Sequence, residues 1–357
     1  MAVFDQMAAM GHEEVIFHSD PASGLRAIVA IHSTALGPAL GGARWHPYAT
    51  EEEALEDVLR LASAMTAKAA VAGIDLGGGK AAVIGDPAAK TDAQIRAYAR
   101  FVDGLGGRYI TTTDVGTTTR DMDRIREETR YVVGLSAERG GGGDTSILTA
   151  QTVVAGMRAA MRFALGDESF RGRHVVVSGV GKVGARVARQ AVAEGARVTV
   201  SDVRADAVRA LAAEIRAEVV APERAHAVEC DVFSPNALGK VLTRRTILQL
   251  RCRVVCGGAN NQLEEDPASA SALAARGIVY APDYVVNCGG LINAGVEWEG
   301  YDASRAHALA DRVYDTTLDV LEEAQRRGIS TAEAAALRVE RRLAAARLAR
   351  EAQRATA

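Results

Sequence analysis

The chain has 357 residues, a formal net charge of −3, and 48% apolar and 24% charged residues. This length and composition indicate a soluble globular protein with two domains. The weak charge and the 4% aromatic content argue against a nucleic-acid partner. No apolar run reaches membrane-spanning length, which argues against a membrane protein. The N-terminus lacks a basic segment before an apolar core, so we expect a cytoplasmic protein.

The first predicted elements are a hairpin and a helix. Residues 13–33 form two β-branched runs on either side of a turn at Pro21–Gly24, which indicates a β-hairpin. Thr50 and Glu53 form a capping-box pattern. The apolar spacing after them predicts a helix that ends near Lys68.

The stretch from Lys68 to Lys80 is the one around which we expect the first domain to be organised. Ala70–Leu76 has the length and apolar character of a buried strand, and Gly77–Gly79 predicts a turn that a ligand can approach closely. Two ammonium groups that face one small volume favour an anionic or carbonyl-bearing ligand. Two solvated lysines that flank a core strand are the alternative.

The next segments alternate between helix and strand. Thr91–Gly104 predicts an amphipathic helix, Arg108–Thr113 a strand, and residues 121–130 a second helix. Asp114 follows the strand, where a carboxylate can exchange protons, although a turn or cap role is the alternative. The glycine run in Arg139–Asp144 predicts an interdomain hinge.

Short apolar strands alternate with helices after Ile147, which predicts parallel βαβ units. The expected strands are residues 174–178, 197–201, 227–230, 253–256 and 277–280, and helices are expected at 290–298, 303–326 and 331–353. The histidines and cysteines form no cluster with metal-ligand spacing, so we predict no metal site.

The segment from Gly179 to Gly184 fits the pattern GxGxxG. It follows a predicted strand and opens a helix, and the next strand ends in Asp202, which together predict a dinucleotide-binding unit. Asp202 would bind the ribose diol and repel a 2′-phosphate, which favours NAD over NADP, whereas the nearby Arg204 weakens that preference. The expected cofactor-binding residues here are Gly179, Gly181, Lys182, Val183, Gly184, Asp202 and Val203.

Six segments resemble the amino-acid dehydrogenase superfamily, and most of all its leucine/valine/phenylalanine dehydrogenase subgroup. They are GPALGGAR, KAAVAGIDLGGGK, RYITTTDVGT, GVGKVG, GANNQL and APDYVVNCGGLIN, and the resemblance covers about residues 10–345. It implies an α/β fold with an N-terminal α/β substrate domain, a Rossmann dinucleotide-binding domain and a cleft between them. We expect the substrate-binding and oligomerisation domain at residues 1–146, completed by a C-terminal helix at 328–357, and the NAD-binding domain at 147–327. A homo-oligomer, at least a dimer, is also implied.

The resemblance also implies a reaction, in which an L-amino acid is oxidatively deaminated to a 2-oxo acid and ammonia with NAD. Lys68 would pair with the substrate carboxylate, Lys80 would activate the water that attacks the imine, and Asp114 would exchange protons with the amino group. An amine beside a second ammonium group loses its proton more readily, which suits the role of Lys80.

The remaining implied contacts concern the side-chain pocket and the ring of the cofactor. The backbone of Gly41 and Gly42 would line the substrate. Thr149, Asn260 and Asn261 would orient the nicotinamide and the substrate amine. The residues expected to line the side-chain pocket are Leu40, Met65, Thr112, Leu291 and Ala294.

The preferred substrate stays open at this point. Leu40 and Leu291 suit valine or leucine, whereas the small Ala294 leaves room for phenylalanine or tryptophan, and the absence of a charged pocket residue argues against glutamate. A catalytically silent NAD-binding regulator is the alternative from another class, against which the retained Lys68, Lys80 and Asp114 argue. The chain departs from the family pattern at four positions that could retune the pocket, namely Thr113, Gln151, Thr152 and Val296.

Overall fold

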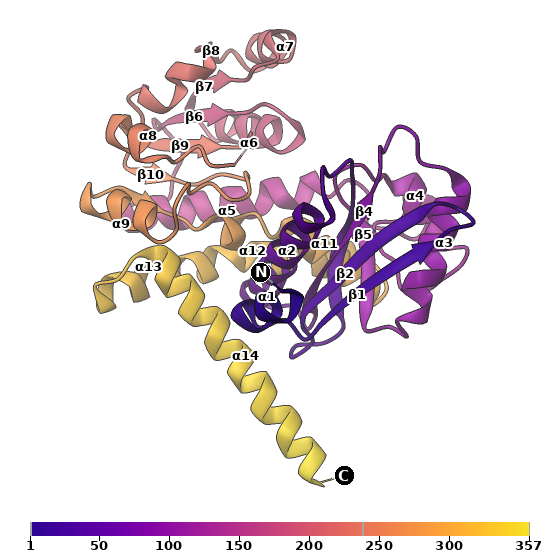
Figure 1. Ribbon diagram of the computed structural model, residues 1–357. Helices are drawn as coiled ribbons and strands as arrows, with labels where there is room; N and C mark the ends of the chain where they lie inside the picture. The colour runs from indigo at the N-terminus through magenta and orange to yellow at the C-terminus, as the bar shows by residue number, and fades with distance from the viewer. Residues whose placement is uncertain (1, 238, 357) are drawn as a thin grey trace. The chain divides into compact units, whose positions relative to one another are not determined.

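The computed structural model describes residues 2–237 and 239–356, and the chain divides into two compact units (Figure 1). Unit 1 comprises Met1–Gly143, Asn293–Arg305 and Val339–Ala357, and unit 2 comprises Asp144–Ile292 and Ala306–Arg338. The chain therefore passes between the units four times.

Unit 1 contains a five-stranded sheet in the order β1-β2-β4-β3-β5. Its strands are β1 (Glu14–Asp20), β2 (Leu25–Ser33), β3 (Ala39–His46), β4 (Gly77–Ile84) and β5 (Tyr109–Thr113). The predicted hairpin is confirmed, because β1 and β2 pair antiparallel and Gly24 N donates to Asp20 O at 2.8 Å. β2 and β4 are also antiparallel, whereas β3 runs parallel to both β4 and β5.

Helices cover both faces of this sheet (Figure 1). One face packs on α2 (Glu51–Ala72) through Ile28, Ala30 and Ala82, and the other packs on α3 (Asp92–Gly104) and α4 (Thr119–Ile125). The remaining short helices of this part of the chain are α1 (Val3–Met10) and η1 (Ala137–Arg139). Thr50 Oγ1 accepts from Glu53 N at 3.1 Å, so the predicted N-cap of α2 is confirmed.

The stretch from Lys68 to Lys80 folds differently from the prediction. α2 continues to Ala72, so Lys68 lies within the helix, and the strand β4 contains the three glycines and Lys80. Alanine is the strongest helix former, so the segment KAAVA extends the helix until Gly73, which adopts φ +74°. A Cβ added at Gly78 would lie 2.1 Å from Thr66 N, which shows that this glycine allows α2 to pack closely on β4.

Unit 2 contains a six-stranded parallel sheet in the order β11-β10-β9-β6-β7-β8. The strands are β6 (His174–Ser178), β7 (Arg197–Ser201), β8 (Glu218–Val219), β9 (Val232–Pro235), β10 (Val254–Val255) and β11 (Val279–Tyr280). Strands added outward on both sides of β6 give the doubly wound Rossmann arrangement, in which the order reverses between β6 and β9. The α/β, two-domain fold class is therefore confirmed.

The helices from residue 146 onward lie wholly or partly in unit 2. They are α5 (Ser146–Leu165), α6 (Lys182–Ala193), α7 (Ala205–Ile215), η2 (Pro222–Ala227), α8 (Arg244–Gln249), α9 (Ala268–Ala275), α10 (Asp283–Val286), α11 (Gly289–Trp298), α12 (Ala303–Asp311), α13 (Val313–Arg327) and α14 (Thr331–Thr356). The strand predicted at residues 227–230 is wrong. Glu229 forms only an isolated bridge to Arg251, and the fully buried run at Val232–Pro235 is the strand instead.

The two units differ from the predicted division at the C-terminal third of the chain. Residues 293–305 belong to unit 1, because Gly295 of α11 packs against Ile74 and Leu76. Residues 328–338 belong to unit 2, and only the part of α14 from Val339 joins unit 1. There, Arg342 donates to the carbonyl oxygens of Ala69 at 3.0 Å and Ala70 at 2.7 Å, at the end of α2.

Candidate active site

An ion pair between a buried lysine and a half-buried aspartate lies in unit 1. Lys80 stands in β4 and is 7% exposed, and Asp114 directly follows β5. Lys80 Nζ lies 2.7 Å from Asp114 Oδ2. β3 separates the two strands in the sheet, so the two side chains meet across β3.

Glycine at position 42 of β3 makes that meeting possible. A Cβ added there would lie 2.7 Å from Asp114 Cβ and 3.3 Å from Lys80 Nζ. The neighbouring Gly41 serves packing within the sheet, since its added Cβ would lie 1.7 Å from Gly79 O. The Gly41 carbonyl also accepts a hydrogen bond from the buried hydroxyl of Tyr109 at 2.6 Å.

Two cations share one oxygen of Asp114. Arg44 Nε donates to Oδ2 at 3.2 Å, beside the Lys80 contact. Burial of the carboxyl acts to raise the pKa of Asp114, but Lys80 and Arg44 outweigh it and lower the pKa below its usual value. The carboxylate is therefore ionised at neutral pH.

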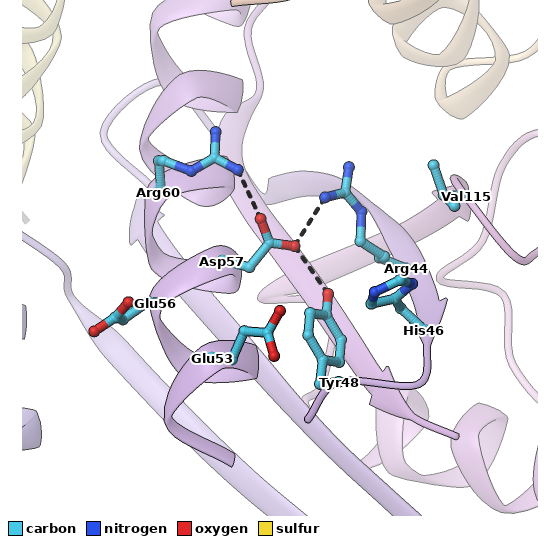
Figure 2. A pocket seen from close by; sticks show the side chains of 8 residues that line it. All are labelled: Arg44, His46, Tyr48, Glu53, Glu56, Asp57, Arg60 and Val115. Carbon is cyan, nitrogen blue, oxygen red and sulfur yellow. Dashed lines mark hydrogen bonds and ion pairs between the residues drawn. The ribbon is translucent and has the colours of Figure 1, made fainter. Parts of the chain in front are cut away.

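Arg44 in turn belongs to an ion-pair network with α2 (Figure 2). Its Nη1 donates to Asp57 Oδ2 at 2.8 Å, and Asp57 also accepts from Tyr48 at 2.9 Å and Arg60 at 2.7 Å. These residues line a pocket of about 490 Å³. Neither Arg44 nor Asp57 was predicted from the sequence as a site residue. Strand periodicity could have indicated Arg44, because it stands two residues after Gly42 on the same face of β3.

The other residues predicted to bind substrate in unit 1 lie on or against one face of the sheet. Leu40 pairs with Gly78, and Gly42 pairs with Thr112, so Leu40 and Thr112 share the face on which Gly78 meets α2. Lys80, two residues after Gly78, points to that face as well. Met65 and Lys68 are half-buried residues of the part of α2 that packs on Gly78.

Two further predicted pocket residues lie on α11. Leu291 and Ala294 are both 5% exposed and stand three residues apart. Leu291 belongs to unit 2 and Ala294 to unit 1, because the chain passes between the units within this helix.

The glycine loop of unit 2 has the geometry of a dinucleotide site. Gly179 adopts φ +98°, and a Cβ at Gly184 would lie 1.9 Å from Gly179 O, so both positions require glycine for the turn and the packing of α6. A Cβ at Gly181 would meet no described atom within 4 Å. Gly181 is also the N-cap of α6 and provides no side-chain cap, and the free N–H groups of a helix N-terminus are donors that suit a diphosphate.

Asp202 follows β7 and lies against this loop. Its carboxylate accepts from Val180 N at 2.8 Å and Arg204 N at 2.9 Å. Burial acts to raise the pKa of Asp202, but these backbone hydrogen bonds and the Arg204 side chain lower it below its usual value. Val203 beside it is 85% exposed, and the Lys182 side chain is 80% exposed and lies 3.7 Å from Asp144. Val183 is half-buried at the start of α6.

The residues expected near the nicotinamide are fixed by their neighbours in unit 2. Thr149 Oγ1 donates to Thr145 O at 2.9 Å within α5. Asn260 Oδ1 accepts from Asn287 Nδ2 at 2.9 Å, and Asn261 adopts the left-handed φ of +51°. The sequence analysis did not single out Asn287.

The described part of the chain contains no helix that is long and apolar enough to cross a membrane.

Two family models match the chain. One, described as Glu/Leu/Phe/Val dehydrogenase, dimerisation domain, matches residues 12–131, and the other, described as Glutamate/Leucine/Phenylalanine/Valine dehydrogenase, matches residues 203–353. Leucine dehydrogenase of Thermoactinomyces intermedius is 48% identical over 96% of this chain and 94% of that protein. Valine dehydrogenase of Streptomyces coelicolor is 49% identical over 94% of this chain and 93% of that protein.

Solved structures give the same result. The L-tryptophan dehydrogenase of Nostoc punctiforme superposes with a TM-score of 0.87 at 40% identity, over 97% of this chain and 99% of that chain. The leucine-bound hetero-hexameric glutamate dehydrogenase of Thermus thermophilus superposes with a TM-score of 0.77 at 25% identity, over 97% and 94% of the two chains. The chain therefore belongs to the Glu/Leu/Phe/Val dehydrogenase family of dinucleotide-dependent enzymes.

Proposed function

We propose that the chain catalyses the reversible oxidative deamination of a branched-chain L-amino acid, valine or leucine, to the 2-oxo acid and ammonia with NAD. The observation that carries the proposal is the Lys80–Asp114 ion pair, with 2.7 Å between its charged atoms. Leucine and valine dehydrogenases at 48% and 49% identity support the reaction class and the choice of substrate.

The chain's own residues would bind the amino acid and move its protons. Lys68 would bind the substrate carboxylate. Bound NAD would accept the hydride from the substrate Cα, which is the chemistry that the cofactor supplies. Asp114 would accept a proton from the amino group. Lys80, as the neutral amine that remains when its ammonium proton has passed to solvent, would take a proton from the water that attacks the resulting iminium carbon. The short Lys80–Asp114 contact would let a proton pass between the two groups before ammonia leaves.

The choice of NAD rests on Asp202. An ionised carboxylate at the end of β7 accepts hydrogen bonds from a ribose diol and repels a 2′-phosphate. The Arg204 side chain is 63% exposed and lies 3.5 Å from Asp202, and it is the group that could favour NADP. The ratio of kcat/KM for NAD to that for NADP tests this choice, and a preference for NADP would show that Arg204 dominates.

An aromatic substrate is the second candidate, because a tryptophan dehydrogenase is 40% identical to this chain. The higher identity to leucine and valine dehydrogenases favours aliphatic substrates. One methylene changes discrimination by only about 1–3 kcal/mol, so we expect broad specificity within the preferred class. Initial rates with valine, leucine, phenylalanine and tryptophan separate the two candidates.

The reaction class has a direct test. An amino-acid dehydrogenase consumes NADH with a 2-oxo acid only when ammonia is present, whereas a 2-hydroxy-acid dehydrogenase needs no ammonia. A silent regulator would bind NAD without turnover in either direction. We expect strict ammonia dependence with the 2-oxo acids of valine and leucine.

A further inference from the structure

We propose that Arg44 is a positioning residue for Asp114, which fixes the carboxylate against Lys80 and sets the charge that the pair presents to the substrate. The inference rests on the proposed function, because it concerns the same carboxylate. The ion pairs that join Arg44 to both Asp114 and Asp57 carry it.

Arg44 is held at two points of its guanidinium group. Nε donates to Asp114 Oδ2 at 3.2 Å, and Nη1 donates to Asp57 Oδ2 at 2.8 Å. The side chain is 23% exposed, so water screens these contacts only in part. A planar guanidinium group that donates to two carboxylates is held in one orientation. Its Nε contact therefore fixes the position of the Asp114 carboxylate.

The Asp57 carboxylate is itself held in place by two further hydrogen bonds. Tyr48 donates its hydroxyl to Asp57 Oδ2 at 2.9 Å, and Arg60 Nη2 donates to Asp57 Oδ1 at 2.7 Å, so both carboxylate oxygens are occupied (Figure 2). Asp57 belongs to α2, the helix that also carries Lys68. Arg44 therefore connects the proton-exchanging carboxylate to the helix proposed to hold the substrate.

The charges alternate along this network. Arg60, Asp57, Arg44, Asp114 and Lys80 follow one another in a series of contacts of 2.7–3.2 Å. The other titratable groups that face it are His46, Tyr48, Glu53 and Glu56 in the pocket and Tyr109 within unit 1. In such a series, removal of a cation and removal of an anion shift the ionisation of Asp114 in opposite directions.

Both cations contact Oδ2 of Asp114. We therefore assign the other oxygen, Oδ1, to proton exchange with the substrate amine. Loss of Arg44 would free the carboxylate to rotate and would make it a stronger base, so that it loses its proton only at higher pH.

A purely structural role for Arg44, in which its ion pairs only hold β3 against α2, predicts different effects of the substitutions on stability and on pH dependence. Arg44→Gln and Asp57→Asn would then both lower stability and leave the pH dependence of turnover unchanged. The pH profile of kcat/KM for the amino acid therefore separates the two roles, with urea denaturation as the measure of stability.

The experiment compares four variants with the wild type. Arg44→Gln is expected to move the acidic limb of the profile upward by roughly one pH unit and to lower kcat about tenfold or more. Asp57→Asn is expected to move the limb downward, because it removes an anion near Asp114.

Arg44→Lys keeps the charge but cannot bridge both carboxylates, so the limb stays near its wild-type position while kcat falls. Glu56→Gln removes a charge from the same pocket without contacting the network, and we expect no change.

Each outcome has a distinct meaning. An acidic limb that stays in place in Arg44→Gln, in an active and folded protein, would overturn the inference. If Arg44→Gln does not fold, an acidic limb that stays in place or moves upward in Asp57→Asn would overturn it instead. A wild type that turns over no amino acid would refute the proposed function, which is a different result from an active wild type with an unshifted variant.

Discussion

At the scale of single residues, the candidate site uses glycine in two ways. At Gly42 a side chain would collide with the Lys80–Asp114 pair, since its Cβ would lie 2.7 Å from Asp114 Cβ. At Gly181 a side chain would meet no described atom within 4 Å. Gly42 has to be glycine because protein atoms occupy the place of a side chain. At Gly181 no protein atom occupies that place, so the glycine leaves room for a ligand.

Gly42→Ala should therefore lower kcat by roughly a hundredfold, because displacement of a catalytic group by about 1 Å costs that much. Gly104→Ala at the end of α3, where an added Cβ meets nothing within 4 Å, is the matched control. Steady-state kinetics of both variants provide the measurement. Wild-type turnover by Gly42→Ala would mean that the Lys80–Asp114 contact tolerates displacement or is not used.

Gly181→Ala should raise the KM for NAD while the free energy of unfolding stays unchanged. Gly184→Ala should instead destabilise unit 2, because its Cβ would lie 1.9 Å from Gly179 O. Cofactor titration by NADH fluorescence and urea denaturation measure the two effects. If Gly181→Ala binds the cofactor as the wild type does, the diphosphate lies elsewhere.

Asp114 also links stability to pH. Its pKa lies below the usual 3.8, so its ion pairs add stability that is present above pH 3.8 and is lost as the pH falls through the lower folded-state value. Asp114→Asn leaves Lys80 and Arg44 without this partner and should cost roughly 3 kcal/mol at neutral pH. The difference from the wild type should shrink below pH 3.8, and urea denaturation at several pH values will show whether it does.

At the scale of elements, the sequence predicted most helices and strands of unit 1 and misplaced those around Lys80. The run Ala69–Ile74 is apolar throughout, so its periodicity does not distinguish a buried strand from a buried helix. Its alanines follow an established helix and extend it, whereas the glycines that come next pack closely against α2 and the neighbouring strands and form the strand β4. Close approach of backbone cannot be read from the sequence of one segment, because the partner segments are distant in the chain.

The helix α11, which the sequence predicted at residues 290–298, carries a hydrogen-bond acceptor that the sequence did not assign. The Glu297 carboxylate accepts from Leu135 N at 3.0 Å and from Gly142 N at 3.1 Å. It thereby holds the segment before the glycine run, within unit 1. Glu297 could not be predicted from sequence as an acceptor, because its donors lie more than 150 residues away in the chain.

Glu297→Ala should destabilise unit 1, because it leaves two backbone N–H groups without their acceptor. Each lost partner costs about 1–3 kcal/mol when the donor is buried. Urea denaturation provides the measurement, and Glu299→Ala on the exposed side of the same segment is the control. Equal stability of the two variants would show that water replaces the carboxylate.

At the scale of the whole molecule, the candidate residues Lys80 and Asp114 in unit 1 and the glycine loop in unit 2 were both predictable from sequence. Lys80 and Asp114 belong to short segments with a recognisable pattern, and Gly179–Gly184 opens a helix after a strand. Asp57 was not predictable, because its significance depends on which strand lies beside which helix, whereas strand periodicity could have indicated Arg44.

The family assignment also leads to an expectation about assembly. The family model over residues 12–131 is described as a dimerisation domain, and we propose that the chain forms at least a dimer through this part. Light scattering coupled to size-exclusion chromatography should give a mass of at least twice 37.5 kDa. A monomer at micromolar concentration with full activity would contradict this proposal.

The most direct test of the account measures NADH consumption with the 2-oxo acid of valine and ammonia, for the wild type and for Lys80→Ala. The account predicts ammonia-dependent turnover by the wild type and a loss of roughly a thousandfold in the variant, which should still bind NADH. Turnover at the wild-type rate by Lys80→Ala, or none by the wild type with any 2-oxo acid, would contradict it.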